Sequence, residues 1–177
     1  MSTMKTSKKV KFLDTIDAHK KIIYKIVNSY CKNNEDRKDL EQEIIIQLWN
    51  SFDNYNPQYK YSTWIYRIAL NVAISSYRKE KKWSAKSDFY NEELIYSISD
   101  ENEYDTELDQ NIRKLQVFIN QLDELNKALM LLYLEEKPHA EIAKILGISK
   151  TNVATKINRL KIKLKEEFQK TSNNGST

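Results

Sequence analysis

Only two glycines and two prolines interrupt the 177 residues of this chain. Few positions can therefore end a helix or adopt a positive φ angle. The β-branched residues recur mostly at helical rather than alternating spacing, which argues against strands. The chain is predicted to be all-α and to consist of long helices.

Gly147, the only glycine before the C-terminal tail, lies between two amphipathic runs. A left-handed residue at this place is typical of the turn in a helix-turn-helix. Ala143 allows two helices to approach closely. The apolar residues on either side are spaced to close a small core, namely Ile142, Leu146, Ile148 and Val153. This segment predicts DNA binding.

The N-terminal half reads as three helices, at about residues 12–32, 36–50 and 63–82, with an aromatic and turn-rich segment at 51–62. The second helix carries a narrow acidic and amide stripe on a wide apolar body. The third helix has an inner face made of Ile65, Ile68, Ala69, Val72 and Ser76. Its other side holds Arg67, Leu70, Asn71, Ile74 and Arg78. Leu70 and Ile74 are unusual for a solvated surface and indicate contact with another helix or a partner.

Residues 84–109 show weak periodicity and a run of carboxylates without Lys or Arg from Asp88 to Asp109. This composition predicts a flexible acidic linker. The predicted organisation is therefore a helical domain at 12–83, a linker at 84–109 and a second helical domain at 110–170.

The second domain is expected to contain four helices, the third beginning at Pro138 and the fourth at Ser149 or Lys150. On a helical wheel, the fourth helix buries Val153, Ile157, Leu160 and Leu164. Its opposite side holds Thr151, Thr155, Asn158, Arg159 and Ile162. Hydroxyl, amide and guanidinium groups read base edges in the major groove, and the flanking lysines suit phosphates.

Bulk properties exclude several other classes. The net charge of +4 identifies no partner by itself. The single cysteine, Cys31, excludes an intramolecular disulfide and fits a reducing cytosol. No apolar run is long enough to cross a membrane, so a cytoplasmic protein without membrane insertion is expected. His19, His139 and Cys31 lack zinc-like spacing, and no metal or cofactor is expected.

Two stretches of the chain resemble a known family. Asp39-Leu40-Glu41-Gln42-Glu43 with Leu48-Trp49, followed by the run from Tyr61 to Asn71, resembles region 2 of bacterial RNA polymerase sigma factors. The helix-turn-helix from Pro138 to Lys165 resembles their region 4. With only a linker between them, the layout is similar to the extracytoplasmic-function (ECF) group.

The resemblance implies three binding surfaces. Region 2 would bind core RNA polymerase through Asp39, Gln42, Glu43 and Trp49. It would recognise and open the minus-ten element of promoter DNA through Tyr59, Lys60, Tyr61, Arg67, Asn71 and Arg78, which supply stacking and cationic groups. Region 4 would read the minus-thirty-five element through Lys150, Thr151, Asn152, Thr155, Lys156, Asn158, Arg159 and Lys163.

The sequence departs from the family pattern at three positions. Leu70 stands where a basic residue is frequent, Ile162 where a polar one is frequent, and Glu136 where glycine is common. An apolar position on each DNA-binding face would suit an anti-sigma factor that masks both. The free protein is expected to be monomeric.

Two other functions are compatible with parts of the pattern. A metal-dependent nuclease would use Asp36, Asp39 and Glu43, but ligands for hard metals usually come from more than one element. A stand-alone helix-turn-helix transcription regulator would dimerise and bind duplex DNA unaided. Binding of core polymerase separates this second alternative from a sigma factor.

Overall fold

The computed structural model describes residues 2–84 and 107–173, and within these two stretches it contains helices and no strand. The all-α prediction is confirmed. None of the helices in these stretches combines the length and the apolar character needed to span a bilayer.

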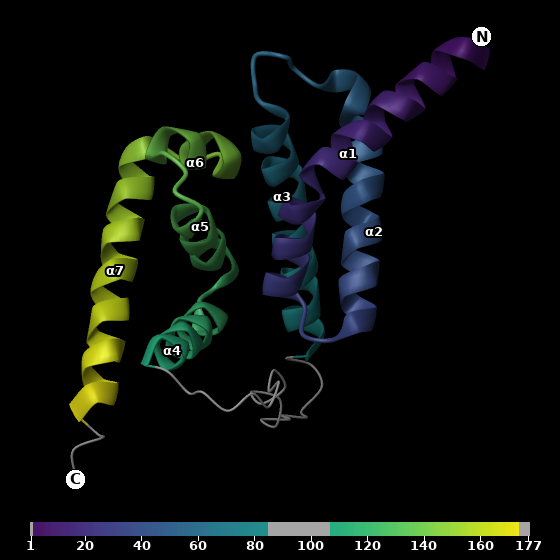
Figure 1. The fold of residues 1–177 in the computed structure, drawn as a ribbon. Coiled ribbons are helices and arrows are strands. Elements are labelled where there is room, and N and C mark those ends of the chain that lie inside the picture. The colour runs from purple at the N-terminus through teal and green to yellow at the C-terminus, as the bar shows by residue number, and fades with distance from the viewer. Residues whose placement is uncertain (1, 85–106, 174–177) are drawn as a thin grey trace.

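An N-terminal bundle is formed by α1 (Ser2–Tyr30), α2 (Asn34–Ser51) and α3 (Tyr61–Ser84), with a short 3-10 helix, η1 (Phe52–Asn54), after α2. Helix α1 begins well before residue 12, where the sequence predicted its start. Residues 2–11 contain neither glycine nor proline to stop a helix, yet they show no apolar periodicity. Figure 1 shows these first turns projecting from the bundle.

A C-terminal bundle is formed by α4 (Glu107–Gln121), α5 (Glu124–Leu134), α6 (His139–Leu146) and α7 (Lys150–Asn173). The side chain of Asp123 caps α5 by accepting a hydrogen bond of 2.9 Å from the amide of Asn126. Pro138 immediately precedes α6, as predicted. The predicted linker at 84–109 lies outside the described residues except for Ser84, which ends α3, and 107–109, which open α4.

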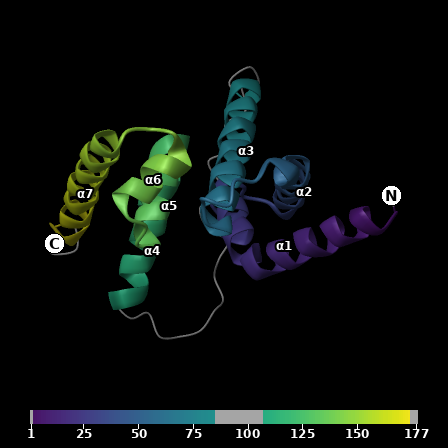
Figure 2. The same cartoon turned by 90° about the horizontal axis from the view of Figure 1, so that it is seen from above.

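The two bundles pack against each other through α3, which contacts both α5 and α6. In Figures 1 and 2, α5 and α6 lie between α3 and α7. Leu70 and Ile74 are only 1% and 9% exposed. These two apolar side chains of α3 are therefore covered by the C-terminal bundle of the same chain.

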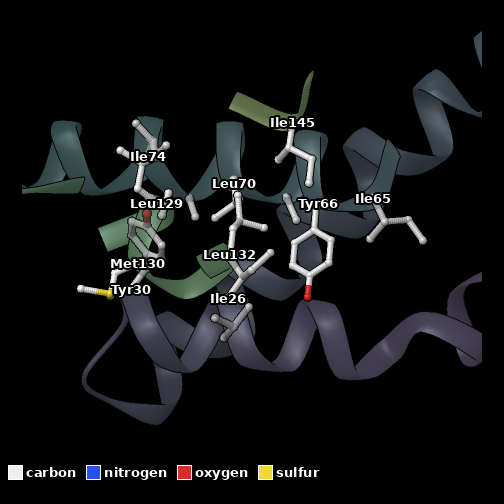
Figure 3. Close-up of a cluster of buried hydrophobic side chains, with 14 of the residues drawn as sticks. Ile26, Tyr30, Ile65, Tyr66, Leu70, Ile74, Leu129, Met130, Leu132 and Ile145 are labelled. Atoms are coloured by element: carbon white, nitrogen blue, oxygen red, sulfur yellow. The ribbon is translucent and has the colours of Figure 1, made fainter. Parts of the chain in front are cut away.

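Buried side chains from both bundles belong to one hydrophobic cluster. Figure 3 draws part of it, with Ile26 and Tyr30 from α1, Ile65, Tyr66, Leu70 and Ile74 from α3, and Leu129, Met130, Leu132 and Ile145 from α5 and α6. The core thus continues from one half of the chain into the other.

The predicted inner face of α3 is correct at Ile65 and Ala69, which are fully buried. Ser76 is exposed, so that part of the prediction is wrong. At this end of α3 the contact with α1 is made instead by Tyr77, whose ring centroid lies 6.1 Å from that of Tyr30.

Candidate nucleic-acid interface

The turn between α6 and α7 has the geometry predicted from Gly147. This residue adopts φ +68°, and the amides of Gly147 and Ile148 both donate to the carbonyl oxygen of Ala143, at 2.9 and 3.2 Å. A Cβ atom added at Gly147 would meet no atom within 4 Å. Glycine is needed here because of the backbone conformation, since there is room for a side chain.

Helix α7 has one buried side and one exposed side. Val153, Ile157 and Leu160 are buried, and Ser149 caps the helix by accepting a hydrogen bond of 3.1 Å from the amide of Asn152. All but one of the residues predicted to contact the minus-thirty-five element are exposed: Lys150, Thr151, Asn152, Thr155, Asn158, Arg159 and Lys163. The exception, Lys156, is half-buried.

The predicted minus-ten residues fall into three environments. Arg67 and Asn71 are exposed on one side of α3, and Lys60 is exposed just before the helix. Tyr61 is half-buried, and its ring stacks on that of Tyr55 with centroids 4.2 Å apart. Stacking on Tyr55 fixes the orientation of the Tyr61 ring.

The remaining two members of the set contact the C-terminal bundle. The guanidinium Nε of Arg78 lies 2.6 Å from Oε1 of Glu124 in α5. This hydrogen bond is the main reason why the pKa of Glu124 is held below its ordinary value. The ammonium group of Lys144 in α6 lies 5.8 Å from the centroid of Tyr59. The sequence did not indicate either contact.

The predicted polymerase-binding residues lie on α2. Asp39, Gln42 and Glu43 are exposed, and Gln47 donates a hydrogen bond of 2.8 Å to Glu43. Trp49 is 37% exposed, because its ring packs edge-on against Phe12 at 5.0 Å. Three polar side chains therefore form an accessible stripe, while Trp49 is partly used in packing α2 on α1.

One of the carboxylates considered for a nuclease site takes part in the start of α2. The side chain of Asp36 accepts a hydrogen bond of 2.6 Å from Asn33, the residue that caps α2. In the part of the chain that the structure describes, no group of three or more His, Cys, Asp or Glu residues could hold a metal ion.

Two sequence-family models match the two bundles. Sigma-70 region 2 matches residues 15–83, and Sigma-70 region 4 matches residues 112–164. The chain belongs to the ECF sigma factors of RNA polymerase. The region 2 match covers the second half of α1, all of α2 and α3 up to its penultimate residue, and the region 4 match covers the helix-turn-helix with the helices that support it.

Curated relatives of this sigma factor align along most of their length. The ECF RNA polymerase sigma factor SigW of Bacillus subtilis (strain 168) is 27% identical over 173 residues, which cover 89% of each chain. The sigma factor SigV of the same organism is 29% identical over 156 residues, covering 88% of this chain and 89% of the relative.

Solved structures show the same fold. CnrH, in complex with the cytosolic domain of CnrY, superposes with a TM-score of 0.63 at 18% identity and covers 91% of this chain and 89% of that one. The sigma factor RpoE of Bartonella quintana, in complex with the anti-sigma factor NepR, gives a TM-score of 0.66 at 17% identity. It covers 91% of this chain and 96% of that one.

Sequence reasoning missed the residues that join the two regions. Lys127 in α5 is 4% exposed, and its ammonium group lies 5.6 Å from the centroids of both Tyr30 and Tyr77. Lys137 lies 5.4 Å from the centroid of Tyr66. A lysine directly before the apolar run 128–132 was the one signal that could have suggested a buried, partnered cation.

Proposed function

We propose that this sigma factor binds core RNA polymerase and directs transcription initiation at promoters that it recognises with both regions. Region 4 would read the minus-thirty-five element in the major groove through α7. Region 2 would recognise and open the minus-ten element through α3 and the segment before it. The protein would act in the cytoplasm, where the polymerase is, and it would have no catalytic activity of its own.

One observation carries this proposal. The exposed side of α7 presents hydroxyl, amide and guanidinium groups at Thr155, Asn158 and Arg159, spaced three or four residues apart or adjacent. These groups form the hydrogen bonds by which major-groove edges are told apart. The same chain presents a second polar and cationic face at Arg67 and Asn71 of α3. A lone helix-turn-helix regulator would need only the first of these faces.

The polar stripe of α2 is proposed as the polymerase contact. Asp39, Gln42 and Glu43 occupy positions i, i+3 and i+4, which lie on one side of a helix. Buried Leu40, Ile44 and Leu48 anchor the opposite side in the bundle. The stripe is therefore displayed on a rigid support and remains free to bind a partner.

An anti-sigma factor is proposed as a further partner. Of the structural neighbours named above, the sigma factor RpoE was solved in complex with the anti-sigma factor NepR, and CnrH was solved in complex with the cytosolic domain of CnrY. Ile162, which is 51% exposed on the DNA-binding side of α7, would give such a partner an apolar contact.

Reconstitution with core polymerase tests the proposal against a stand-alone regulator. Purified full-length protein, bacterial core enzyme and a library of randomised promoters should give initiation enriched for particular minus-thirty-five and minus-ten sequences. Light scattering should show a monomer in the absence of polymerase. Tight sequence-specific binding of a free dimer to duplex DNA, without promoter-specific initiation, would favour the regulator instead.

A further inference from the structure

A groove on the surface of region 2, here called the α1 groove, runs between α1 and the start of α3. Its volume is about 660 Å³, within the range of roughly 300–1,000 Å³ that is common for sites holding a small ligand. All of its lining residues but one belong to α1, where they recur every three or four positions from Ser7 to His19. The exception is Tyr61, the first residue of α3. The groove therefore follows one side of α1 for about three turns.

The α1 groove offers ring faces and apolar carbon atoms more than free hydrogen-bonding groups. The hydroxyl of Thr15 donates to the carbonyl oxygen of Lys11 at 2.7 Å, and Nδ1 of His19 donates to the carbonyl oxygen of Thr15 at 2.8 Å. The rings of His19 and Tyr61 lie 6.3 Å apart between centroids, and Val10 is 53% exposed. A flat aromatic ligand suits such a surface better than a strongly polar one.

The first described turns of α1 are held firmly beside the segment that precedes α3. Lys8 pairs with Asp53 of η1 at 2.5 Å, and its ammonium group lies 4.6 Å from the ring centroid of Trp49. Phe12 packs edge-on against Trp49 and Phe52, with centroids 5.0 and 5.2 Å away. These contacts fix the α1 side of the groove relative to the aromatic group that contains Tyr61.

Tyr61 connects the α1 groove to the proposed minus-ten surface. Its ring stacks on Tyr55, it belongs to the predicted minus-ten residues, and it also lines the groove. Unpaired bases stack on aromatic side chains whatever their sequence, because every base has a π face. A DNA strand that passes Tyr61 can therefore enter the groove directly from the minus-ten surface.

The charges at the α1 groove favour a nucleotide whose base points inward. Lys11 lines the groove from α1, and Lys60 immediately precedes Tyr61; both lysines are exposed. Two ammonium groups at this place suit the phosphates on either side of one nucleotide. Asp14, which also lines the groove, would repel a phosphate inside it. The base is therefore the part of the nucleotide that fits inside.

Much of the α1 groove lies outside the part of the chain that the family match covers. The Sigma-70 region 2 match begins at residue 15, whereas Ser7, Val10, Lys11 and Asp14 precede it. The general region 2 pattern thus does not assign this site.

We propose that the α1 groove binds one unpaired base of the opened promoter strand, at a nucleotide adjacent to those contacted by the minus-ten residues. Helix α1 thereby extends the surface that holds the opened strand and stabilises the open promoter. The proposal rests on the proposed function, because only a protein that opens promoter DNA meets an unpaired promoter strand.

Ala18 offers a variant that fills the α1 groove without a change of charge. It is exposed and lines the groove, so the larger side chain of Ala18→Leu occupies space that the base needs. Ser76→Leu is the matched control, since it also replaces a small, neutral and exposed side chain on a helix of region 2. Ser76 lies about 180° around α3 from Arg67 and so faces away from the minus-ten surface.

A scan with abasic nucleotides locates the bound base. Holoenzyme is assembled from core polymerase and full-length protein, and its affinity is measured for fork-junction promoters with an unpaired strand that carries one abasic nucleotide at a time. The unsubstituted protein and Ser76→Leu should lose at least about fivefold in affinity at one position adjacent to the minus-ten element. Ala18→Leu should bind intact DNA more weakly by a similar factor and lose nothing further at that position. An equal loss in Ala18→Leu and the unsubstituted protein would overturn the proposal.

Photocross-linking provides an independent measurement of the same contact. p-Benzoylphenylalanine replaces Ala18 in one protein and Ser76 in the other, and both holoenzymes are irradiated on the intact fork-junction promoter. The probe at Ala18 should cross-link to the nucleotide found in the abasic scan, and the probe at Ser76 should not. Cross-links from Ala18 to polymerase alone would show that the groove faces the enzyme and would overturn the proposal.

Failure of the groove and failure of the proposed function give different results. If the unsubstituted holoenzyme shows no specific binding to promoter DNA, the proposed function fails and the role of the α1 groove fails with it. If the holoenzyme binds and the abasic scan detects bases of the minus-ten element, but no position responds to Ala18→Leu, the groove proposal alone is wrong.

Discussion

Lys127 donates a hydrogen bond of 3.1 Å to the main-chain carbonyl oxygen of Ser29, which joins the first half of α5 to the last turn of α1. The C-terminal end of a helix favours a cation, and the adjacent tyrosine rings add to this preference. Burial disfavours the charged form of Lys127, and it is the main reason why the pKa of this group lies below its ordinary value of 10.5. The positive charge of Lys32 lowers the pKa further.

The stability of the protein should depend on pH through Lys127. Because its pKa is lowered by folding, the unfolded chain binds more protons than the folded chain between the lowered pKa and 10.5. The contribution of this group to the free energy of unfolding therefore rises with pH in that window. Urea unfolding measured at a series of pH values up to 10.5 should give a steeper rise for the unsubstituted protein than for Lys127→Met. Equal slopes would contradict the assignment.

Glu124 should give a pH dependence of the same sign in a different window, at acid pH. The hydrogen bond from Arg78 lowers the pKa of Glu124 below 4.5, so its stabilising contribution is present above 4.5 and is lost as the pH falls through the lowered value. Glu124→Gln should unfold with a weaker acid dependence between about pH 6 and pH 3. Glu166→Gln, at an exposed position of α7, is the control and should keep the original dependence.

Two residues with a positive φ angle, Glu136 and Gly147, should change the free energy of unfolding in opposite directions when glycine replaces the first and alanine replaces the second. Glu136 adopts φ +55°, a conformation that costs a residue with a side chain about 1 kcal/mol or more. Glu136→Gly should raise the free energy of unfolding by about 1 kcal/mol, and Gly147→Ala should lower it by about the same amount. Urea unfolding monitored by circular dichroism measures both. A destabilised Glu136→Gly would show that the carboxylate makes a contact that outweighs the backbone strain.

Arg159→Ala should reduce discrimination at the minus-thirty-five element by about 1–3 kcal/mol, the range for a good bidentate contact with a base. Competition binding of the polymerase holoenzyme to promoters with single substitutions measures this loss. Lys163→Ala is the comparison, because a phosphate contact should weaken binding to all sequences alike and reduce the salt dependence. If Arg159→Ala also weakens all sequences equally, Arg159 contacts phosphate.

Asp39→Ala combined with Glu43→Ala should impair binding to core polymerase and leave the helical content unchanged. Co-purification with tagged core enzyme tests this. The control is Glu41→Ala combined with Asp14→Ala, which makes the same change in net charge at other exposed positions. Glu41 lies about 200° around α2 from Asp39 and is therefore outside the proposed contact. Equal loss of binding in the two double variants would show a general charge effect instead of a specific contact.

Features set by local chemistry could be predicted from the sequence. The turn at Gly147 depends on one backbone angle that few residues other than glycine adopt, and the buried side of α7 follows directly from the spacing of Val153, Ile157 and Leu160. The start of α1 was missed because residues 7–11 are helical although their side chains are mostly exposed. Helical periodicity reports burial and carries no signal where a helix extends into solvent.

The partner of Leu70 and Ile74 could not be predicted for a different reason. Their apolar character on a polar side of α3 was visible in the sequence, and it indicated that something covers them. Which surface does so depends on contacts between residues far apart in the chain, such as Arg78 with Glu124. Nothing in the local pattern of either segment encodes that pairing.

The continuous core has a consequence for how the two halves can change over evolution. A substitution at Tyr30 or Tyr66 alters the surface on which Lys127 or Lys137 rests, so the two regions cannot vary independently. A chimera that takes region 4 from another sigma factor would inherit intact DNA-reading groups and still place a foreign surface against α3. Exchange of modules within this family is therefore constrained by fit between the modules as well as by the promoter that each one reads.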